Sequence, residues 1–388
     1  MNEAAIHVDV AFVGGGVASL WLACLAQSLG LSVVVIAPAP LGGEQTMASQ
    51  GIIHGGAKYS LNGSAKKAGH LTAMPARWRR CLAGNAVAGS GDLDLSGVTV
   101  LAEHVELRAC TRRARLRQRA AARLLTGAAN TPALASGANR LPDFVVDVES
   151  LIARLVGGIE GCLLAEKVGP EQVRRGDEGV AGIHLATTTV VAQRYVFAAG
   201  AGNVELAPRL GFGTSTTVLR PLHQAWAVVE HPPPTFAHCL VRAFGTEPDL
   251  TVTTHEAGNK TVLYLGGHLA TAGIARSADD QIDATKHVLA RALPHLDLTH
   301  ARFGTVRVAR AEPALAAARR TDDAFLTARG NALLCFPVKL SLAPRLGDLF
   351  LNEVAGLKPV APPQAAACVL QGKQDARRQA VKLARPWA

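Results

Sequence analysis

The chain has 388 residues, 49% of them hydrophobic, and a formal net charge of +10 from 40 Lys and Arg against 30 Asp and Glu. This hydrophobic content excludes a disordered chain, and the length suits two lobes better than one simple core. The positive charge favours anionic ligands without naming one. We expect no transmembrane segment, because the most apolar stretch, residues 17–37, contains Gln27 and breaks at Gly30.

The seven cysteines include no C-x-x-C pair, and no signal peptide is recognisable at the start of the chain. We therefore expect reduced thiols in a cytosolic protein, and the spacing of Cys and His predicts no metal site. Cys335 lies in the apolar run LLCFPVK, where a small buried side chain is a better interpretation than a reactive thiol.

The first forty residues predict a dinucleotide-binding unit. A short apolar strand runs directly into Gly14, Gly15 and Gly16, and a helical stretch (residues 17–30) and a second β-branched strand follow. In such a unit Gly14 permits the tight turn, and Gly16 lets the backbone approach a pyrophosphate. The N-terminus of the helix then supplies free N–H groups and a positive dipole end.

Two residues depart from the usual fingerprint of this unit. Ser19 replaces the third glycine, and it is small enough to allow close packing of helix on strand. Ala37 stands at the end of the second strand, where an acidic residue would hold the ribose hydroxyls. The residues for a pyrophosphate contact are therefore present, whereas the acidic residue for a ribose contact is absent.

The stretch SQGIIHGGAKYSLNGSAKKAG, residues 49–69, surrounds His54 with glycines. Its core IIHGGAKY resembles the Ile-His-Gly-Gly-x-x-Tyr segment of FAD-dependent glycerol-3-phosphate dehydrogenases. Its extension through GSAKK resembles L-2-hydroxyglutarate dehydrogenases and oxidases even more closely. Both groups belong to the D-amino-acid-oxidase-like superfamily of flavoproteins, in which this segment also follows the dinucleotide-binding unit.

Further matches to this superfamily follow in chain order. Residues 141–156 resemble its central Val-Asp-x-x-x-Leu helix start, residues 194–203 its late strand ending in Ala-Gly-Ala, and residues 306–314 the segment that carries a substrate-binding Arg. Residues 331–354 resemble the closing strand and helix beside the flavin. This last segment has Pro-Val-Lys at 337–339 in place of the Gly-rich pattern of the family.

The resemblance implies an α/β fold with a Rossmann-like, discontinuous FAD-binding domain and a mixed, mostly antiparallel β-sheet substrate domain. The FAD-binding domain is expected from residues 1–80, 145–214 and 305–388, and the substrate domain from residues 81–144 and 215–304. Two strand-rich runs at 214–230 and 250–267 fit such a sheet.

The resemblance also implies FAD as the cofactor. The glycines around His54 would clear space against the flavin, and Ser49 would donate its hydroxyl to the pyrophosphate. The residues that the resemblance assigns to cofactor binding are Gly14, Gly15, Gly16, Ser19, Ser49, Gly51, Ile53, His54, Gly55, Gly56, Ala199, Gly200 and Lys339.

Three residues are candidates for catalysis. His54 could accept the substrate proton, since a histidine titrates near neutral pH, but hydrogen bonding to the cofactor, covalent tethering of the flavin and a purely structural place in a turn remain alternatives. Arg310 is the candidate clamp for a substrate carboxylate, and Lys339 could stabilise negative charge on the reduced ring or bind substrate.

The predicted function is oxidation of a small anionic substrate by hydride transfer to flavin N5, with a 2-hydroxy acid as first choice. An amine or amino acid is the alternative, and a flavoprotein-fold binding or assembly protein without turnover is the rival from another class. Oxygen, a quinone or a protein carrier could accept the electrons. We expect a cytoplasmic protein, in contact with the inner face of the membrane if the acceptor is a quinone.

An arginine-rich segment, residues 108–123, is predicted as a basic helix followed by a polar loop. It suits either an anionic partner or membrane surface, or a plain solvated helix, and no nucleic-acid partner is expected. Its arginines are Arg112, Arg113, Arg115, Arg117, Arg119 and Arg123.

Overall fold

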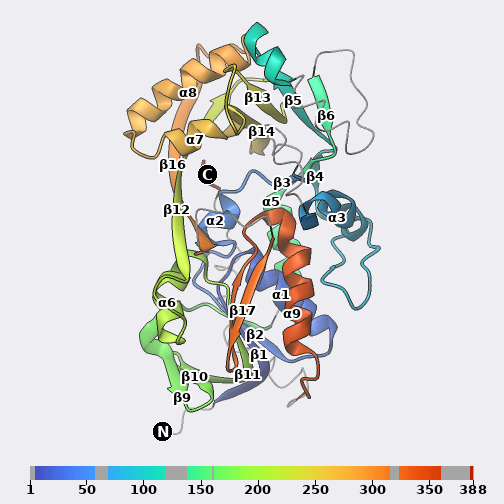
Figure 1. Ribbon diagram of the computed structural model, residues 1–388, viewed down its shortest axis with the longest axis vertical. Helices are drawn as coiled ribbons and strands as arrows, with labels where there is room; N and C mark the ends of the chain where they lie inside the picture. Colours follow the sequence, from blue (N-terminus) through green and yellow to red (C-terminus); the bar gives the residue numbers. More distant parts are fainter. Residues whose placement is uncertain are drawn as a thin grey trace.

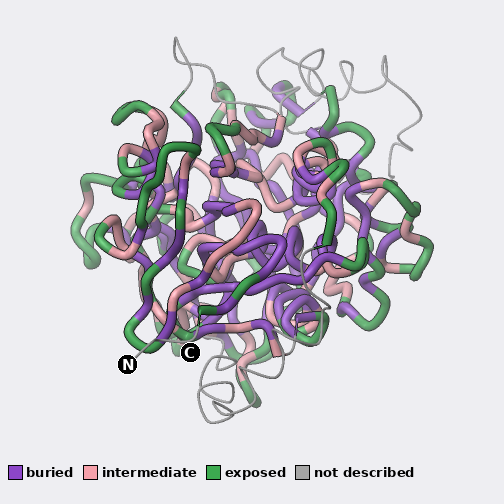
Figure 2. Tube along the Cα trace, turned by 90° about the horizontal axis from the view of Figure 1, so that it is seen from below, coloured by how far each residue is buried: buried purple, intermediate pink, exposed green. Residues whose placement is uncertain are grey.

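The computed structural model describes residues 5–56, 69–118, 138–159, 161–314, 323–359 and 385–387. Three β-sheets organise these residues, an eight-stranded sheet in the lower half of Figure 1, a seven-stranded sheet in the upper half and a small three-stranded sheet between them. Buried residues fill the interior and exposed residues lie along the outer turns (Figure 2).

The eight-stranded sheet is built around parallel strands that are buried along nearly their whole length, as expected for a sheet covered on both faces. Its order is β17 (Phe325–Arg329), β18 (Ala332–Phe336), β11 (Thr189–Phe197), β1 (Ile6–Val13), β2 (Val33–Ile36) and β8 (Leu163–Leu164), and β10 (Gly179–His184) pairs with β11 and with β9 (Val173–Gly176).

Three helices pack on one face of this sheet: α1 (Val17–Ser28), α5 (Val148–Gly158) and α9 (Ala343–Val354). Their apolar side chains form a core with Phe12 and Val35 of the strands. Asp147 caps α5, because its carboxylate accepts a hydrogen bond of 2.9 Å from the Ser150 N–H. Sequence and structure agree on the strand–helix–strand unit at the start of the chain.

The seven-stranded sheet is mixed and mostly antiparallel, as predicted. Its order is β16 (Arg302–Pro313), β12 (Thr217–Val229), β15 (Lys260–Gly266), β14 (Leu250–Ala257), β13 (Ala237–Leu240), β5 (Val105–Ala109) and β6 (Ala138–Leu141), with only the β13–β5 pair parallel. Helices α7 (His268–Ala272) and α8 (Ala278–Ala292) cover its outer face, where Ala225, Leu263 and Leu289 form a second core.

The small sheet joins β3 (Ile52–Ile53), β7 (Phe144–Val146) and β4 (Val100–Ala102). It holds the segment before His54 beside the segment that leads into α5. The remaining helices are short and connect these layers: α2 (Gly43–Met47), α3 (Met74–Leu82), α6 (Asn203–Arg209), η3 (Gly69–Ala73), η4 (Pro170–Gln172), η5 (Gly200–Gly202) and η6 (Leu340–Leu342).

The predicted domain boundary at residue 305 falls inside β16, which is hydrogen-bonded to β12 along its whole length. Leu93 and Leu95, from the segment predicted for the substrate domain, pack in the core of the eight-stranded sheet. The division into two domains therefore stays a prediction. β16 crosses the boundary at residue 305, and part of the segment assigned to the substrate domain packs with the other sheet.

The predicted start of the arginine-rich helix is wrong. Residues 105–109 form β5, because their alternating apolar side chains are buried in the seven-stranded sheet, and the helical residues are 112–118. Thr111 begins this helix by accepting a hydrogen bond of 3.1 Å from the Ala114 N–H. Arg119 and Arg123 lie outside the described residues.

Cys335 is buried in β18, and burial raises the pKa of its thiol, which confirms an unreactive apolar role. Within the described ranges no group of His, Cys, Asp and Glu is arranged to hold a metal ion. The same ranges contain no helix that is both long enough and apolar enough to span a bilayer.

A buried ion-pair network ties α3 to α9. Arg77 binds Asp92 through Nε and donates from Nη1 and Nη2 to the Asp348 carboxylate at 2.6 and 2.7 Å. Burial alone raises the pKa of Asp348, but hydrogen bonds from Arg77 and the Gly91 N–H outweigh it and hold that pKa below its usual value. The network therefore stabilises the fold in the charged state of Asp348.

We predict that Arg77→Met lowers the free energy of unfolding by about 3 kcal/mol at pH 7, because it leaves the Asp92 carboxylate buried without its partner. Since the pKa of Asp348 is lower in the folded state, its contribution is present above pH ~4 and is lost as the pH falls further. Urea unfolding at several pH values should show the difference from wild type shrinking in acid.

Arg79→Met, on the same helix, is the matched control. Arg79 pairs with Glu103 at the surface, so its loss should cost about 1 kcal/mol or less. Equal losses from the two variants would contradict the role given to the buried network.

Candidate functional site

The glycine turn after β1 is shaped by a close approach of two chain segments. Gly14 has a φ of +122°, and a Cβ on it would lie 2.5 Å from the Ala198 carbonyl oxygen. A side chain at Gly14 would thus disturb the fold itself. The same contact brings Ala199, predicted for cofactor binding, against the turn, and Gly200 follows with a φ of +57°.

Gly16 meets a different constraint. It caps α1 in an extended conformation without any side-chain cap, and a Cβ there would lie 3.2 Å from Thr46 Oγ1 and 3.8 Å from the Gly42 carbonyl oxygen. The first turn of α1 donates one N–H, from Val17, to the same Thr46 oxygen at 3.2 Å. The backbone conformation of Gly16 does not require glycine, unlike that of Gly14. Its lack of a side chain instead leaves space at the N-terminus of α1.

Of the two serines predicted for the cofactor, Ser19 is buried and Ser49 is half-buried. The hydroxyl oxygens of Ser19 and Ser49 have no hydrogen-bond partner within the part of the chain that the structure describes. Ser19 lies in the core side of α1, whereas Ser49 follows α2, whose Thr46 faces the glycine turn. An open helix terminus beside an unsatisfied hydroxyl fits the phosphate oxygens of FAD, which accept hydrogen bonds.

The packing around Ala37 leaves no room for an acidic side chain at the end of β2. The methyl group of Ala37 is buried, and a Cβ on Gly15 would lie 3.0 Å from it. The same Cβ would lie 2.9 Å from Leu41 Cδ2. This corner is filled by apolar packing, so a ribose would have to be held by other groups.

Residues 48–51, here called the clasp segment, join the seven-stranded sheet to the small three-stranded sheet. The Tyr264 hydroxyl lies 2.9 Å from the Ala48 carbonyl oxygen, and Gln50 Nε2 donates to the carbonyl oxygens of Thr251 and Tyr264 at 3.1 and 3.0 Å. Gly51, with a φ of +71°, lies so close to β7 that a Cβ would meet the Val146 oxygen at 2.1 Å.

His54 follows β3 and is 6% exposed. Its backbone N–H donates to Ser341 Oγ at 2.9 Å, and the Gly55 N–H donates to Asp143 Oδ1 at 2.9 Å. Ser341 comes two residues after Lys339, so the structure brings two segments predicted to contact the flavin together across 287 positions of sequence. Ile53 and Gly56 lie in the same segment, both buried.

The chain reverses sharply between β18 and η6. Val338 has a φ of +63°, and the Lys339 N–H donates back to the Pro337 oxygen at 2.6 Å. A β-branched residue in this left-handed region is strained by about 1–3 kcal/mol. The family pattern has glycines in this turn. Here the left-handed position is occupied by Val338, whose β-branched side chain disfavours that conformation.

Arg310 lies in β16 directly opposite Arg220 of β12. The register of these strands is unbroken, so both side chains share the sheet face of Gln224 and Trp226, opposite to the face covered by α8. Glu312 on the same face approaches Arg220 Nε at 2.7 Å and Arg310 Nη2 at 3.9 Å. The side chain of Arg310 is 26% exposed.

Sequence reasoning missed a row of buried polar groups on this inner face of the seven-stranded sheet. His238 Nδ1 lies 2.9 Å from Thr251 Oγ1, His255 Nε2 lies 2.9 Å from Thr253 Oγ1, and the Tyr264 hydroxyl lies 2.8 Å from Gln224 Oε1. The signal was available in LTVTTHEA, where Thr251, Thr253 and His255 recur with the two-residue period of a strand.

A second missed feature is the segment of residues 385–387. Arg385 is buried and donates from Nη1 to the carbonyl oxygens of Met47 and Ser49 at 3.0 and 3.2 Å. It also pairs with Asp147 at 3.3 Å and with Glu149 at 3.2 Å. Trp387 packs edge-on against Tyr264, with ring centroids 4.8 Å apart.

This packing helps to bury His255, whose ring centroid lies 5.0 Å from that of Trp387. Burial, and then the charge of Arg385, lowers the pKa of His255 to about 3. His255 is therefore neutral at physiological pH and can exchange hydrogen bonds without carrying charge.

Comparisons with known proteins agree with this geometry. The family model described as FAD dependent oxidoreductase matches residues 9–331. The probable FAD-dependent oxidoreductase PA4991 of Pseudomonas aeruginosa is 39% identical over 374 residues, which cover 92% of this chain and 93% of the relative.

Solved structures share the fold. The crystal structure of PA4991 from Pseudomonas aeruginosa matches with a TM-score of 0.75 and 34% identity, over 92% of this chain and 93% of that one. Glycine oxidase from Geobacillus kaustophilus matches with a TM-score of 0.64 and 16% identity, over 91% and 96% of the two chains.

We predict that Gly16→Val yields a folded protein without FAD, because the extended backbone accepts valine while the side chain occupies the open helix terminus. Gly14→Val should fail to fold, because it meets the Ala198 backbone. Absorbance of bound flavin and thermal melting separate the two effects. A Gly16→Val protein as yellow as wild type would place the cofactor elsewhere.

We predict that Arg385→Gln weakens FAD binding roughly tenfold, because two hydrogen bonds that hold the carbonyls of Met47 and Ser49 are lost. Titration of apoprotein with FAD, followed by flavin fluorescence, measures the change. Arg345→Gln, which breaks an ion pair with Asp323 away from the clasp segment, is the control. Equal effects of the two variants would argue against a specific role for Arg385.

Proposed function

The chain belongs to the FAD-dependent oxidoreductases of the D-amino-acid-oxidase-like superfamily, and on this premise we propose that it oxidises a small carboxylic acid at its α-carbon. A 2-hydroxy acid is our first candidate and an amino acid the second. The observation that carries the proposal is the place of Arg310, opposite Arg220 on the inner face of the seven-stranded sheet.

The substrate carboxylate would bind Arg310. A planar guanidinium grips a carboxylate through two parallel hydrogen bonds, which fixes the orientation of the α-carbon as well as its position. Gln224 and Tyr264 share this face and offer polar groups for the rest of a small substrate. Gln224 and Tyr264 are buried, so their polar groups would meet a substrate with little competition from water.

His54 would accept the proton of an α-hydroxyl group. Its backbone is held by Ser341, and the neighbouring Gly55 is held by Asp143, so the imidazole is attached to a segment with a fixed position. FAD, when bound, supplies the hydride acceptor. Lys339, three residues after the end of β18, would favour negative charge near the same segment.

An amino acid substrate is favoured by the kinds of enzyme that share this fold. Glycine oxidase, an L-amino acid deaminase from Proteus vulgaris and an iminodiacetate oxidase are among the similar structures, at 13 to 16% identity. A neutral amine has no hydroxyl proton to lose, so its oxidation would depend less on His54. The cellular location and the electron acceptor, oxygen, a quinone or a protein carrier, stay predictions.

The test is anaerobic reduction of the bound flavin by a panel of 2-hydroxy acids and amino acids. With a hydroxy acid, His54→Gln should keep FAD bound and slow reduction by roughly 10²–10⁴-fold. Arg310→Lys should raise the apparent KM by roughly ten- to a hundredfold while kcat changes less, because the charge stays and the paired hydrogen bonds are lost.

Two surface changes serve as controls, His300→Gln and Arg302→Lys, the latter at the far end of the strand that carries Arg310. Neither should alter reduction or KM. Rapid reduction of His54→Gln by an amino acid would select the second candidate. Failure of every acid to bleach the flavin would overturn the proposal and favour a binding protein without turnover.

A further inference from the structure

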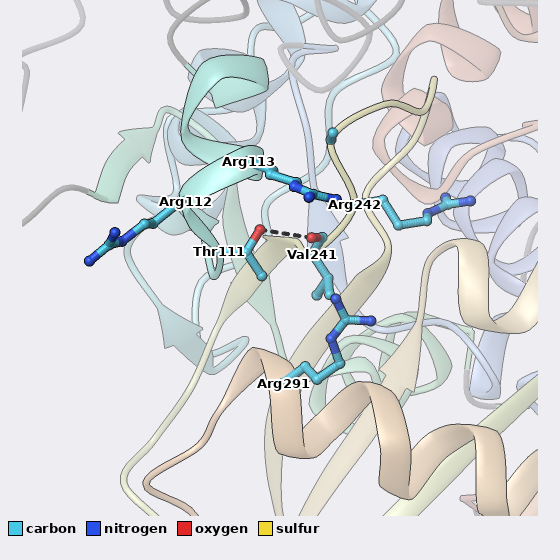
Figure 3. Close-up of a pocket in the computed structure, with 7 residues that line it drawn as sticks. Thr111, Arg112, Arg113, Val241, Arg242 and Arg291 are labelled. Atoms are coloured by element: carbon cyan, nitrogen blue, oxygen red, sulfur yellow. Dashed lines mark hydrogen bonds between the residues drawn. The ribbon is translucent and has the colours of Figure 1, made fainter.

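A hollow lined with arginines lies at the end of the molecule formed by β5, β13 and α8, far from β9 (Figure 1). Its volume is about 470 Å³. Figure 3 shows Arg113 on the helical residues after Thr111 and Arg291 on α8 directed toward Val241 from different sides, while Arg112 points outward. Within the described chain, Thr111, Arg112, Arg113, Val241, Arg242, Ala243 and Arg291 line the hollow.

The positive charge here exceeds the nearby negative charge. Asp249 is already shared between Arg117, at 3.0 Å, and Arg242. No acidic side chain lines the hollow, and in the part of the chain that is described Arg112, Arg113 and Arg291 form no ion pair. Arginines gathered without acids favour an anionic ligand with several oxygen acceptors, such as phosphate groups.

Two large apolar side chains are exposed beside these arginines. Phe244 is 87% exposed and Leu116 is 69% exposed, more than any other large hydrophobic residue whose exposure the structure describes. They belong to segments in contact, because Arg117 donates to the Glu247 oxygen at 2.5 Å and its guanidinium lies against Gly245. Apolar side chains in water next to unpaired positive charge are typical of an interfacial surface.

We propose that this end of the molecule binds the surface of an anionic phospholipid bilayer. The arginines would contact lipid phosphates, and Phe244 and Leu116 would enter the acyl boundary beneath them. A nucleic acid could use the same arginines and stack a base on Phe244, but the exposed aliphatic side chain of Leu116 would have no partner in it. The combination of charge with exposed aliphatic and aromatic side chains therefore favours lipid.

The experiment is flotation of the FAD-loaded full chain with vesicles of phosphatidylcholine alone or mixed with phosphatidylglycerol. We expect binding to the mixed vesicles only, weakened by salt. The double variant Arg113→Gln with Arg291→Gln should bind about 25-fold more weakly, at about fivefold per arginine. Phe244→Ser should weaken binding roughly tenfold, because its apolar contact is lost.

The matched control is Arg174→Gln with Arg175→Gln, the same charge change on exposed residues of β9 at the opposite end of the molecule. It should bind vesicles as wild type does. Three outcomes would overturn the proposal. The control variant could lose as much binding as the patch variants, or wild type could bind neither kind of vesicle. Wild type could also bind a single-stranded oligonucleotide, with that binding abolished in the patch variants. Vesicle binding needs no turnover, so its failure leaves the proposed function standing, and melting temperatures confirm that the variants fold.

Discussion

The clasp segment is the constraint on which the rest of the site depends. Ala48 and Gln50 are hydrogen-bonded to the inner face of the seven-stranded sheet, and Gly51 lies against β7, so one short loop contacts both the seven-stranded sheet and the small one. A shift of this loop would move Ser49 and break the hydrogen bonds of Gln50 to the polar face at once. The cofactor contact proposed for Ser49 and the proposed substrate surface would therefore change together.

Glycines do two separate tasks around this loop. At Gly14 and Gly51 the backbones of neighbouring segments come too close for any Cβ, so glycine serves the fold. At Gly16 the backbone is extended, and the atom nearest to a Cβ would be a side-chain oxygen, Thr46 Oγ1 at 3.2 Å, so the glycine is not required by its own backbone; a contact with the pyrophosphate is our proposal for it. Val338 shows the reverse case, a left-handed turn kept without glycine, and the hydrogen bond from the His54 N–H to Ser341 helps to hold the segment that follows it.

The two faces of the seven-stranded sheet bury different kinds of side chain. Its outer face is apolar and covered by α8, whereas its inner face buries histidines, threonines and a tyrosine in pairs that satisfy one another. Burying a polar side chain costs free energy of folding unless it is hydrogen-bonded. Arg385 and Trp387 pack at the edge of this face, Arg385 through a hydrogen bond to Met47 and Trp387 against Tyr264. The result is a dry, polar surface that suits orientation of a small acid.

The sequence by itself determined the strand–turn–helix–strand unit, because that unit rests on local periodicity and on glycines spaced along a short stretch. The order of the flavoprotein segments and the mixed sheet followed from the family resemblance, which the two strand-rich runs at 214–230 and 250–267 supported. The tertiary structure alone decided that His54 meets Ser341, that Arg310 faces Arg220, and that Arg385 returns to Met47 and Ser49. These contacts join residues far apart in the chain, and no local pattern encodes which distant strand or loop will lie opposite. The start of the arginine-rich helix was misplaced for the same reason, since only pairing with β13 shows that residues 105–109 are a strand.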